Sequence, residues 1–164
     1  MKDNQEELFT VVDKDDHILE YRTRYDCHHD ISLTHRVTDI AIFNNKDELL
    51  LQKRSMQKDL FPGYYTLSAA GHVSKGEEYE EAAKRELEEE LGVKNVPLQM
   101  VGKVIVETDF ETEMVAVFIG KHNVPFQFAK DEIDIVNFFS QEEIKKIKNL
   151  TPVAKACLKI LKIL

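Results

Sequence analysis

Cysteine, net positive charge and long apolar runs are all scarce in this chain of 164 residues, and each shortage excludes a class of protein. The two cysteines, Cys27 and Cys157, lie far apart in the sequence, which fits reduced thiols rather than a disulfide framework. No apolar run approaches the length that spans a bilayer, and the opening stretch MKDNQEELFT lacks the apolar core of a secretion signal. We therefore expect a cytoplasmic protein with no membrane partner.

The charge balance is acidic, with a formal net charge of −8. General binding to a nucleic acid polymer needs a basic surface that releases counterions from phosphates, so we expect no such partner. A phosphate-bearing ligand must instead be held locally, by a metal ion or by a few placed cations. The length and the 43% hydrophobic content suffice for one buried core. Residues 1–164 are therefore expected to form a single domain, as a monomer or a homodimer.

Short apolar runs between turn-rich stretches predict strands through most of the chain. An N-terminal hairpin and loop are expected over 8–34, with strands at 8–12 and 18–22. The loop carries Cys27, His28, His29 and Asp30. Later strands are predicted at 37–43 and 49–55, which form a second hairpin, and at 64–70, 99–107, 113–120 and 133–139. This pattern indicates an α+β layered domain without internal repeats.

Two short helices are predicted over 140–164, separated at Thr151 and Pro152. Ser140 and Glu143 have the spacing of a capping box, which fixes the start of the first helix. The second helix is strongly apolar, and we expect it to pack on its own domain.

A third helix is predicted within the segment 71–93, GHVSKGEEYEEAAKRELEEELGV, which is crowded with glutamate. Ser74 and Glu77 have capping-box spacing, and Gly92 suits the left-handed end of a helix, so the helix should span about 76–91. Its apolar positions recur every four residues and should pack on the sheet; they are Tyr79, Ala83, Leu87 and Leu91.

Glu86, Glu89 and Glu90 project together from a neighbouring face of this helix because they are three and four residues apart. Like charges at this spacing repel, so a cation should compensate them. Carboxylate oxygens suit Mg²⁺, which keeps some waters and is otherwise held by substrate phosphates. Arg85 could hold one of the carboxylates in a bidentate pair and fix its direction.

The simpler interpretation is a solvated acidic surface, which is what most charge runs are. It accounts for Glu78, Glu80, Glu81 and Glu88. It does not account for the spacing of the remaining positions. Those positions resemble a complete Nudix box, G-x5-E-x7-R-E-U-x-E-E-x-G-U; the matching residues are Gly71, Glu77, Arg85, Glu86, Leu87, Glu89, Glu90, Gly92 and Val93.

The resemblance implies a Nudix fold, with the box as a loop, helix and loop on a mixed β-sheet layered between helices. It also implies a pyrophosphohydrolase that depends on Mg²⁺ or Mn²⁺ and acts on a nucleoside diphosphate linked to another group. Carried over by position, the metal ligands are Glu86, Glu89 and Glu90, with the carbonyl of Ala70 as a further ligand. Glu77 and Arg85 would orient this cluster.

Within this superfamily, residues 8–120 most resemble isopentenyl-diphosphate isomerase and its hydrolase-like relatives. The isomerase holds a metal with three histidines and two glutamates, which implies His28, His35, His72, Glu111 and Glu113 here. Imidazole and carboxylate together suit Zn, Mn or Fe better than Mg. His29 is an alternative to His28. A single histidine is more often an exposed or structural residue than a metal ligand.

The segment LLLQKRSMQKDLFPG resembles the part of the isomerase that binds diphosphate, which implies that Arg54 and Lys58 contact phosphate. Ordinary surface charge explains these two residues equally well. One departure separates the chain from the isomerase: Ala70 stands where the isomerase has a catalytic cysteine. A second is that the isomerase's box is degenerate at the carboxylates, whereas this one is intact.

These features predict a cytoplasmic Nudix hydrolase of the isomerase-like subgroup, acting on a small-molecule diphosphate. The general base is expected to be Glu113 or Glu111, or else a glutamate of the box. The alternatives are isopentenyl-diphosphate isomerase, which Ala70 disfavours, and a nucleotide-binding module without turnover, which the intact carboxylates disfavour.

Overall fold

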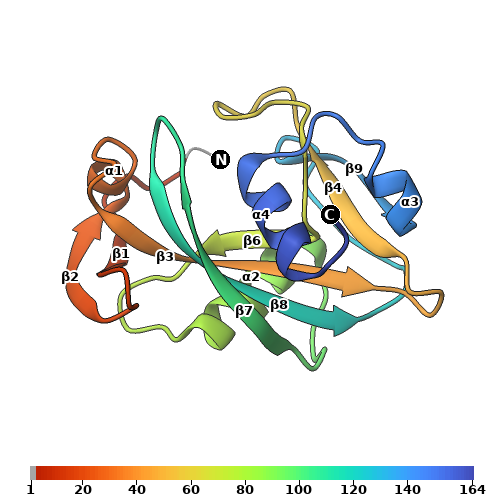
Figure 1. Cartoon of the computed structure of the whole chain (residues 1–164), viewed down its shortest axis with the longest axis horizontal. Coiled ribbons are helices and arrows are strands. Elements are labelled where there is room, and N and C mark those ends of the chain that lie inside the picture. Colours follow the sequence, from red (N-terminus) through yellow and green to blue (C-terminus); the bar gives the residue numbers. More distant parts are fainter. Residues whose placement is uncertain (1–2) are drawn as a thin grey trace.

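The computed structural model describes residues 3–164, and its elements follow one another in the order shown in Figure 1. The N-terminal half contains β1 (Leu8–Val12), β2 (Ile18–Thr23), α1 (Arg24–Cys27), β3 (Thr34–Phe43), β4 (Leu49–Arg54), β5 (Tyr65–Thr66), β6 (Ala69–His72) and α2 (Tyr79–Leu91). The C-terminal half contains β7 (Gln99–Glu107), β8 (Thr112–Lys121), β9 (Ile133–Phe139), α3 (Gln141–Ile144) and α4 (Pro152–Ile160).

Strand β3 organises the sheet because it contacts β1, β4, β6 and β8. It runs parallel to β8 along its whole length, from the pair Thr34↔Thr112 to the pair Phe43↔Lys121. The other strand pairs are antiparallel, so the sheet is mixed. Strand β8 lies along one edge of β3, and β1, β6 and β4 lie along the other, so β3 is a central strand. Apolar cores cover both of its faces, which explains its nearly continuous apolar run. The predicted α+β architecture with a mixed sheet is confirmed.

Helices cover both faces of the sheet, as the alternation of side chains along β3 requires. Ile40 and Ile42 point to the face covered by α2, where the predicted helix stripe of Tyr79, Ala83, Leu87 and Leu91 is buried. Val37 and Ala41 point to the opposite face, which α4 covers with Ala154, Cys157 and Leu158. The two apolar cores therefore lie on either side of one sheet.

The predicted N-terminal hairpin is present as β1 and β2 and lies at one end of the molecule (Figure 1). The following loop differs from the prediction, because Arg24–Cys27 form the short helix α1. Its start is fixed by Thr23, whose side chain accepts a hydrogen bond from the Asp26 N–H. This single turn carries His28 toward the centre of the molecule.

The start of the glutamate-rich helix was predicted three residues too early, since α2 begins at Tyr79. Glu78 is the N-cap, and it forms the capping box with Glu81. The predicted pair instead closes the preceding turn, where the Ser74 N–H donates to Glu77 Oε2 and Gly76 has a φ of +88°. A positive φ is incompatible with a right-handed helix, so the backbone at Gly76 prevents the helix from beginning at Ser74.

The structure also tests the other predicted boundaries. The run 64–70 is divided between β5 and β6, and β3 begins at Thr34 because its parallel pairing with β8 extends that far. Strands β7 and β9 have the predicted bounds, and the Ser140–Glu143 capping box is confirmed. Gly92 ends α2 with a φ of +67°, as predicted. Among the described residues, no helix has the length and apolar character needed to cross a bilayer.

Candidate active site

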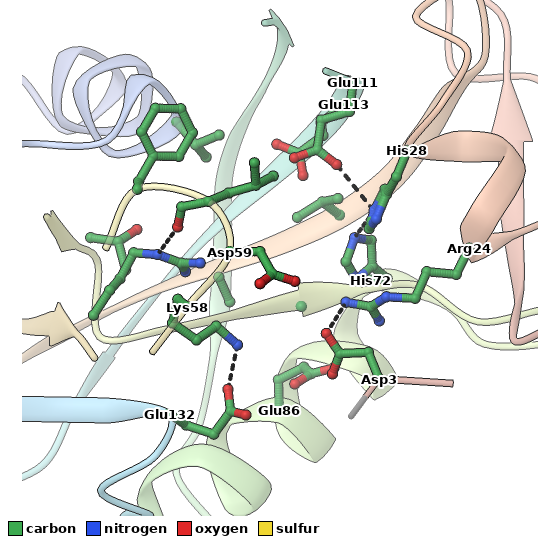
Figure 2. Close-up of a pocket in the computed structure, with 18 of the residues that line it drawn as sticks. Asp3, Arg24, His28, Lys58, Asp59, His72, Glu86, Glu111, Glu113 and Glu132 are labelled. Atoms are coloured by element: carbon green, nitrogen blue, oxygen red, sulfur yellow. Dashed lines mark hydrogen bonds and ion pairs between the residues drawn. The ribbon is translucent and has the colours of Figure 1, made fainter. Parts of the chain in front are cut away.

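A cleft of about 1310 Å³ opens where β3, β6, the start of α4 and the glutamate-bearing face of α2 meet. Figure 2 shows acidic and basic side chains pointing into it from segments far apart in the sequence. Of the residues proposed from the sequence, those lining the cleft are Arg54, Lys58, Ala70, Gly71, His72, His28, His29, Glu77, Arg85, Glu86, Glu89, Glu90, Glu111 and Glu113. His35 lies beneath its wall and is fully buried.

Gly71 allows the carboxylate of Glu86 to reach the cleft from α2. A Cβ atom at position 71 would lie 2.0 Å from Cδ of Glu86, a separation that no real side chain tolerates. The first glycine of the box therefore leaves the space that the Glu86 side chain occupies, and its backbone angles do not call for glycine. A side chain at this position would displace the Glu86 carboxylate from where it lies in this structure.

Arg85 fixes the acidic groups around it with a planar set of donors. Its Nε and Nη2 donate to the two oxygens of Glu77, over 2.6 and 3.0 Å, and Nη1 donates to Glu86 Oε1 over 2.6 Å. Nη2 also donates to the carbonyl of His72 over 3.0 Å. These charged hydrogen bonds raise the pKa of Arg85, with Glu77 contributing most. Arg85 thereby ties α2 to the preceding turn and to β6.

The three box carboxylates occupy different environments. Burial raises the pKa of Glu90 to about 8 and that of Glu86 to about 7. Glu90 accepts a 2.6 Å hydrogen bond from Nε2 of Gln52, whereas the Glu89 side chain is 59% exposed. Arg85 Nη1 donates to Glu86 and, over 3.3 Å, to Glu89 Oε2, so these two carboxylates share one partner, while Glu90 is held by Gln52.

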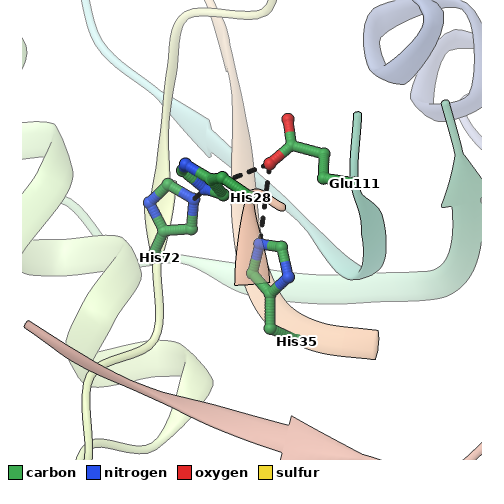
Figure 3. A group of neighbouring side chains, drawn as sticks. All are labelled: His28, His35, His72 and Glu111. Atoms are coloured by element: carbon green, nitrogen blue, oxygen red, sulfur yellow. Dashed lines mark hydrogen bonds and ion pairs between the residues drawn. The ribbon is translucent and has the colours of Figure 1, made fainter. Parts of the chain in front are cut away.

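A second group of candidate ligands lies beside the box and consists of His28, His35, His72 and Glu111 (Figure 3). One ligand atom from each lies within 4.8 Å of all the others. His28 Nε2 is 3.1 Å from both His72 Nε2 and Glu111 Oε2, and His35 Nε2 is 3.8 Å from the same oxygen. We call these four residues the histidine cluster. Four predicted positions thus meet in space.

Several polar atoms of the histidine cluster lack hydrogen-bond partners among the described residues. Both ring nitrogens of His35 are buried without a partner, and so is Glu111 Oε2, because its approach to His28 lacks hydrogen-bond geometry. Burial lowers the pKa of His35 to about 3 and that of His28 to about 4, so both rings are neutral. Neutral imidazoles with free nitrogens fit a borderline transition-metal ion well.

The ring of Phe9 in β1 packs against the histidine cluster. It stacks on His72 at 4.1 Å between centroids and on His35 at 5.5 Å, and it is fully buried. The adjacent His29 instead stacks on Tyr25 and hydrogen-bonds to the carbonyl of that residue. The choice between neighbouring histidines that spacing left open therefore falls on His28.

Glu113 is close to the histidine cluster but outside the group of four. It pairs with His35 across β3 and β8 and is only 7% exposed. Its pKa is raised well above the usual range, first by burial and then by the charge of Glu111. Figure 2 shows the carboxyl groups of both glutamates beside His28.

Arg54 and Lys58 stand on the opposite side of the cleft. Nε of Arg54 donates to the carbonyl of Leu60 over 3.1 Å, and burial lowers the pKa of the guanidinium. Lys58 Nζ is 2.5 Å from Glu132 Oε2. Both cations line the cleft, and Figure 2 shows the ammonium group of Lys58 directed at Glu132.

Reasoning from the sequence missed three residues, of which Arg24 and Asp39 line the cleft and Gln52 contacts a residue that does. Arg24 of α1 is paired with Asp3 over 2.9 Å, and Gln52 of β4 holds Glu90. Asp39 is a fully buried acid within the apolar strand β3. A signal for the last two was available, because a polar residue inside the apolar runs LLLQKR and VTDIAIF is unusual.

The family assignment agrees with this geometry. A family model for the NUDIX domain matches residues 33–159. The uncharacterized Nudix hydrolase PA4841 of Pseudomonas aeruginosa is 35% identical over 136 residues, which cover 83% of this chain and 80% of that protein. The uncharacterized Nudix hydrolase YfcD of Salmonella typhi is 31% identical over 138 residues, covering 84% and 74%. The chain belongs to the Nudix hydrolase family, whose members act on pyrophosphate bonds.

Solved structures with the same fold extend across most of the chain. DR0079 from Deinococcus radiodurans has a TM-score of 0.78 at 22% identity, covering 94% of this chain and 99% of that one. The NUDIX domain of Shewanella oneidensis NrtR, in complex with ADP ribose, has a TM-score of 0.64 at 15% identity and covers 77% and 85%. An Ap4A hydrolase from C. elegans has a TM-score of 0.62 at 21% identity, covering 77% and 94%.

Proposed function

We propose that the protein hydrolyses the diphosphate linkage of a nucleoside diphosphate derivative or a similar organic pyrophosphate. The observation that carries the proposal is the placement of Glu86 and Glu90 in the cleft, with Arg85 fixing Glu86 and its surroundings. Arg54 and Lys58 line the opposite side, where they would contact the phosphate groups. Cations and carboxylates thus face each other across a space that suits a metal-bound diphosphate.

The box residues fit Mg²⁺, with Mn²⁺ as the alternative. Their donors are hard oxygens, and Gly71 leaves the room that the Glu86 carboxylate occupies. Glu86, Glu89, Glu90 and the carbonyl of Ala70 would hold the ion. When bound, such an ion neutralises the diphosphate and makes a water molecule more acidic. The raised pKa values of Glu86 and Glu90 then return toward normal, because a neighbouring cation favours the charged carboxylate.

The reaction needs a base for the water that attacks phosphorus. As the water oxygen bonds to one phosphorus, the bridging oxygen departs with the other phosphate group, and a carboxylate receives the released proton. Glu111 and Glu113 line the cleft and are candidates for this role, as is a glutamate of the box. Arg85 touches Glu86 and acts as a positioning residue.

An activity screen with Mg²⁺ and with Mn²⁺ tests the proposal. The panel contains nucleoside diphosphate derivatives, dinucleotides and isopentenyl diphosphate, and both phosphate-ended products and isomers are detected. We expect release of phosphate or a nucleoside monophosphate that Glu90→Gln abolishes. Glu88→Gln, on the exposed face of α2, is the matched control and should retain activity. Hydrolysis that survives Glu90→Gln would contradict the proposal.

The histidine cluster favours a second candidate, isopentenyl-diphosphate isomerase activity. Its three imidazoles and Glu111 form a group that hydrolysis by the box does not require. Ala70 weighs against this candidate because its methyl group cannot transfer a proton. Exchange of solvent deuterium into isopentenyl diphosphate measures it directly, and absence of exchange at saturating Mn²⁺ or Zn²⁺ would exclude it.

Location and assembly complete the proposal. Cys27 and Cys157 are buried free thiols, which suits a reducing compartment, so we place the protein in the cytoplasm. We propose a monomer or a homodimer, and sedimentation analysis distinguishes the two.

A further inference from the structure

Asp39 lies where the floor of the cleft passes under α4. It is fully buried in β3, and strand alternation turns it away from α2 and toward α4, on the same face as Val37 and Ala41. The strand register places Ala70 of β6 beside it. Asp39 lines the cleft together with Thr66 of β5 and Thr151, the N-cap of α4. One end of the cleft therefore has an acid set among apolar and hydroxyl-bearing neighbours.

The carboxyl of Asp39 is incompletely satisfied. Its Oδ2 accepts a 3.7 Å hydrogen bond from the Cys157 thiol, while Oδ1 is buried without a partner in the described part of the chain. Burial also raises the pKa of Asp39 to about 8. Buried polar atoms in native proteins nearly always have a partner, so an exception needs a specific explanation. A ligand group entering the cleft can supply the missing hydrogen bond.

We propose that Asp39 determines substrate specificity by accepting a hydrogen bond from an N–H or O–H group on the non-phosphate part of the substrate. The inference rests on the proposed diphosphate hydrolysis and names the class of group attached to the diphosphate. An amino-bearing nucleobase or a hydroxyl-bearing moiety supplies such a donor. A hydrocarbon tail does not, and it would leave Oδ1 unpaired in a closed site.

This hydrogen bond predicts that the protein distinguishes two ligands that differ by a single hydrogen-bond donor. Sites built to hydrogen-bond a substrate group reject analogues that lack it, because the buried partner is then left unpaired. Oδ1 accepts a hydrogen bond whether the carboxyl is ionised or carries its proton on the other oxygen. The preference therefore does not require one charge state of Asp39.

The first experiment measures binding to the wild-type protein with Mg²⁺ by calorimetry. Methylene-bridged diphosphate analogues that resist cleavage are compared in pairs that differ by one amino group, such as adenosine against purine riboside and 2-aminopurine riboside against purine riboside. We expect the amino-bearing member of at least one pair to bind about tenfold more tightly. Equal binding within every pair, or no binding of any analogue, overturns the proposal.

The second experiment tests the residue itself. Asp39→Leu should remove the tenfold preference, whereas Asp39→Asn keeps an acceptor oxygen and should retain most of it. Thr38→Val is the matched control, because Thr38 Oγ1 is also buried without a described partner but lies on the α2 face of the same strand. An unchanged preference in folded Asp39→Leu overturns the proposal. If that variant does not fold, Asp39→Ala takes its place, and an unchanged preference in folded Asp39→Ala likewise overturns the proposal.

The two proposals fail in distinguishable ways. If no panel compound is hydrolysed, the proposed function fails. The calorimetric pairs still show whether Asp39 accepts a hydrogen bond from the ligand. If hydrolysis occurs with equal efficiency on donor-bearing and donor-free compounds, only the role of Asp39 fails.

Discussion

The cleft holds two sets of candidate metal ligands, and they are prepared in different ways. The box carboxylates already have protein partners, since Glu86 is bonded to Arg85 and Glu90 to Gln52. The histidine cluster has the opposite condition, because His35 and Glu111 keep buried atoms without partners among the residues described. One set must exchange existing hydrogen bonds for an ion, while the other gains bonds that it lacks.

This difference teaches what kind of ion each set suits. Partnered, negatively charged oxygens lose some interactions when an ion enters, which favours an exchangeable ion that arrives with a substrate. The neutral imidazoles, one of which stacks on Phe9, give up few hydrogen bonds when an ion binds. This favours a resident ion. The following predictions separate the two sets, beginning with the largest effect.

Glu86→Gln should reduce Mg²⁺-dependent diphosphate hydrolysis by at least about 100-fold, because it removes a charged ligand from the box. The measurement is kcat/KM on the best substrate from the screen. Glu88→Gln serves as the control, since Glu88 pairs with Lys94 on the surface. A Glu86→Gln variant with near wild-type activity would show that the box is not the catalytic centre.

His72→Gln should weaken Co²⁺ binding to the histidine cluster by about 10- to 100-fold, because it removes one of four ligands. The visible absorption of Co²⁺ changes with its ligands and reports this site without any turnover. His29→Gln is the matched control, because His29 stacks on Tyr25 outside the group. Glu86→Gln should leave the Co²⁺ spectrum intact; loss of the spectrum in that variant would mean that the two sets form one site.

Arg85→Lys should lower the apparent Mg²⁺ affinity by about tenfold, because lysine keeps the charge but not the fork that holds Glu77 and Glu86. The free energy of unfolding in urea should also fall by about 1.5–3 kcal/mol, the value of a charged hydrogen bond. Lys84→Arg on the exposed face of α2 is the control. Unchanged Mg²⁺ affinity would contradict the positioning role of Arg85.

The metal-free protein should become less stable as pH rises from 6.5 to 8. The pKa values of Glu86 and Glu90 are raised to about 7 and about 8, so the folded state retains protons that the unfolded state has lost. The buried histidines oppose this slope near pH 6.5, because the unfolded state still holds part of their protons there, and the opposition fades as the pH approaches 8. We expect Tm to fall by roughly a few degrees. Saturating Mg²⁺ should reduce the fall in Tm. A Tm that rises between pH 6.5 and 8 would contradict the raised pKa values of Glu86 and Glu90.

Much of the site was predictable where the sequence has a fixed period or spacing. The stripe of α2, the strands β7 and β9 and the end of α2 at Gly92 follow from patterns that depend only on neighbouring residues. The start of α2 was not predictable in the same way. Two pairs with capping-box spacing follow each other there, Ser74–Glu77 and Glu78–Glu81, and the left-handed backbone of Gly76 decides between them.

Other features depend on tertiary pairing, which a local pattern does not contain. The parallel alignment of β3 with β8 brings His35 beside Glu113, although 78 positions separate them in the sequence. The partner of Glu90 is Gln52, and the unpaired oxygen of Asp39 is visible only once α4 is in place. Each of these required the sheet order to be known.

The stacking of Phe9 under the histidine cluster makes the N-terminal hairpin part of the site's construction. The NUDIX family model begins at residue 33, so His28 and Phe9 lie outside the matched segment while His35 and His72 lie inside it. The start of the segment that the family model matches therefore falls between members of one ligand group. Metal occupancy of that group would report whether the hairpin has docked, and a shortened chain could keep the box while losing the means to complete its neighbour.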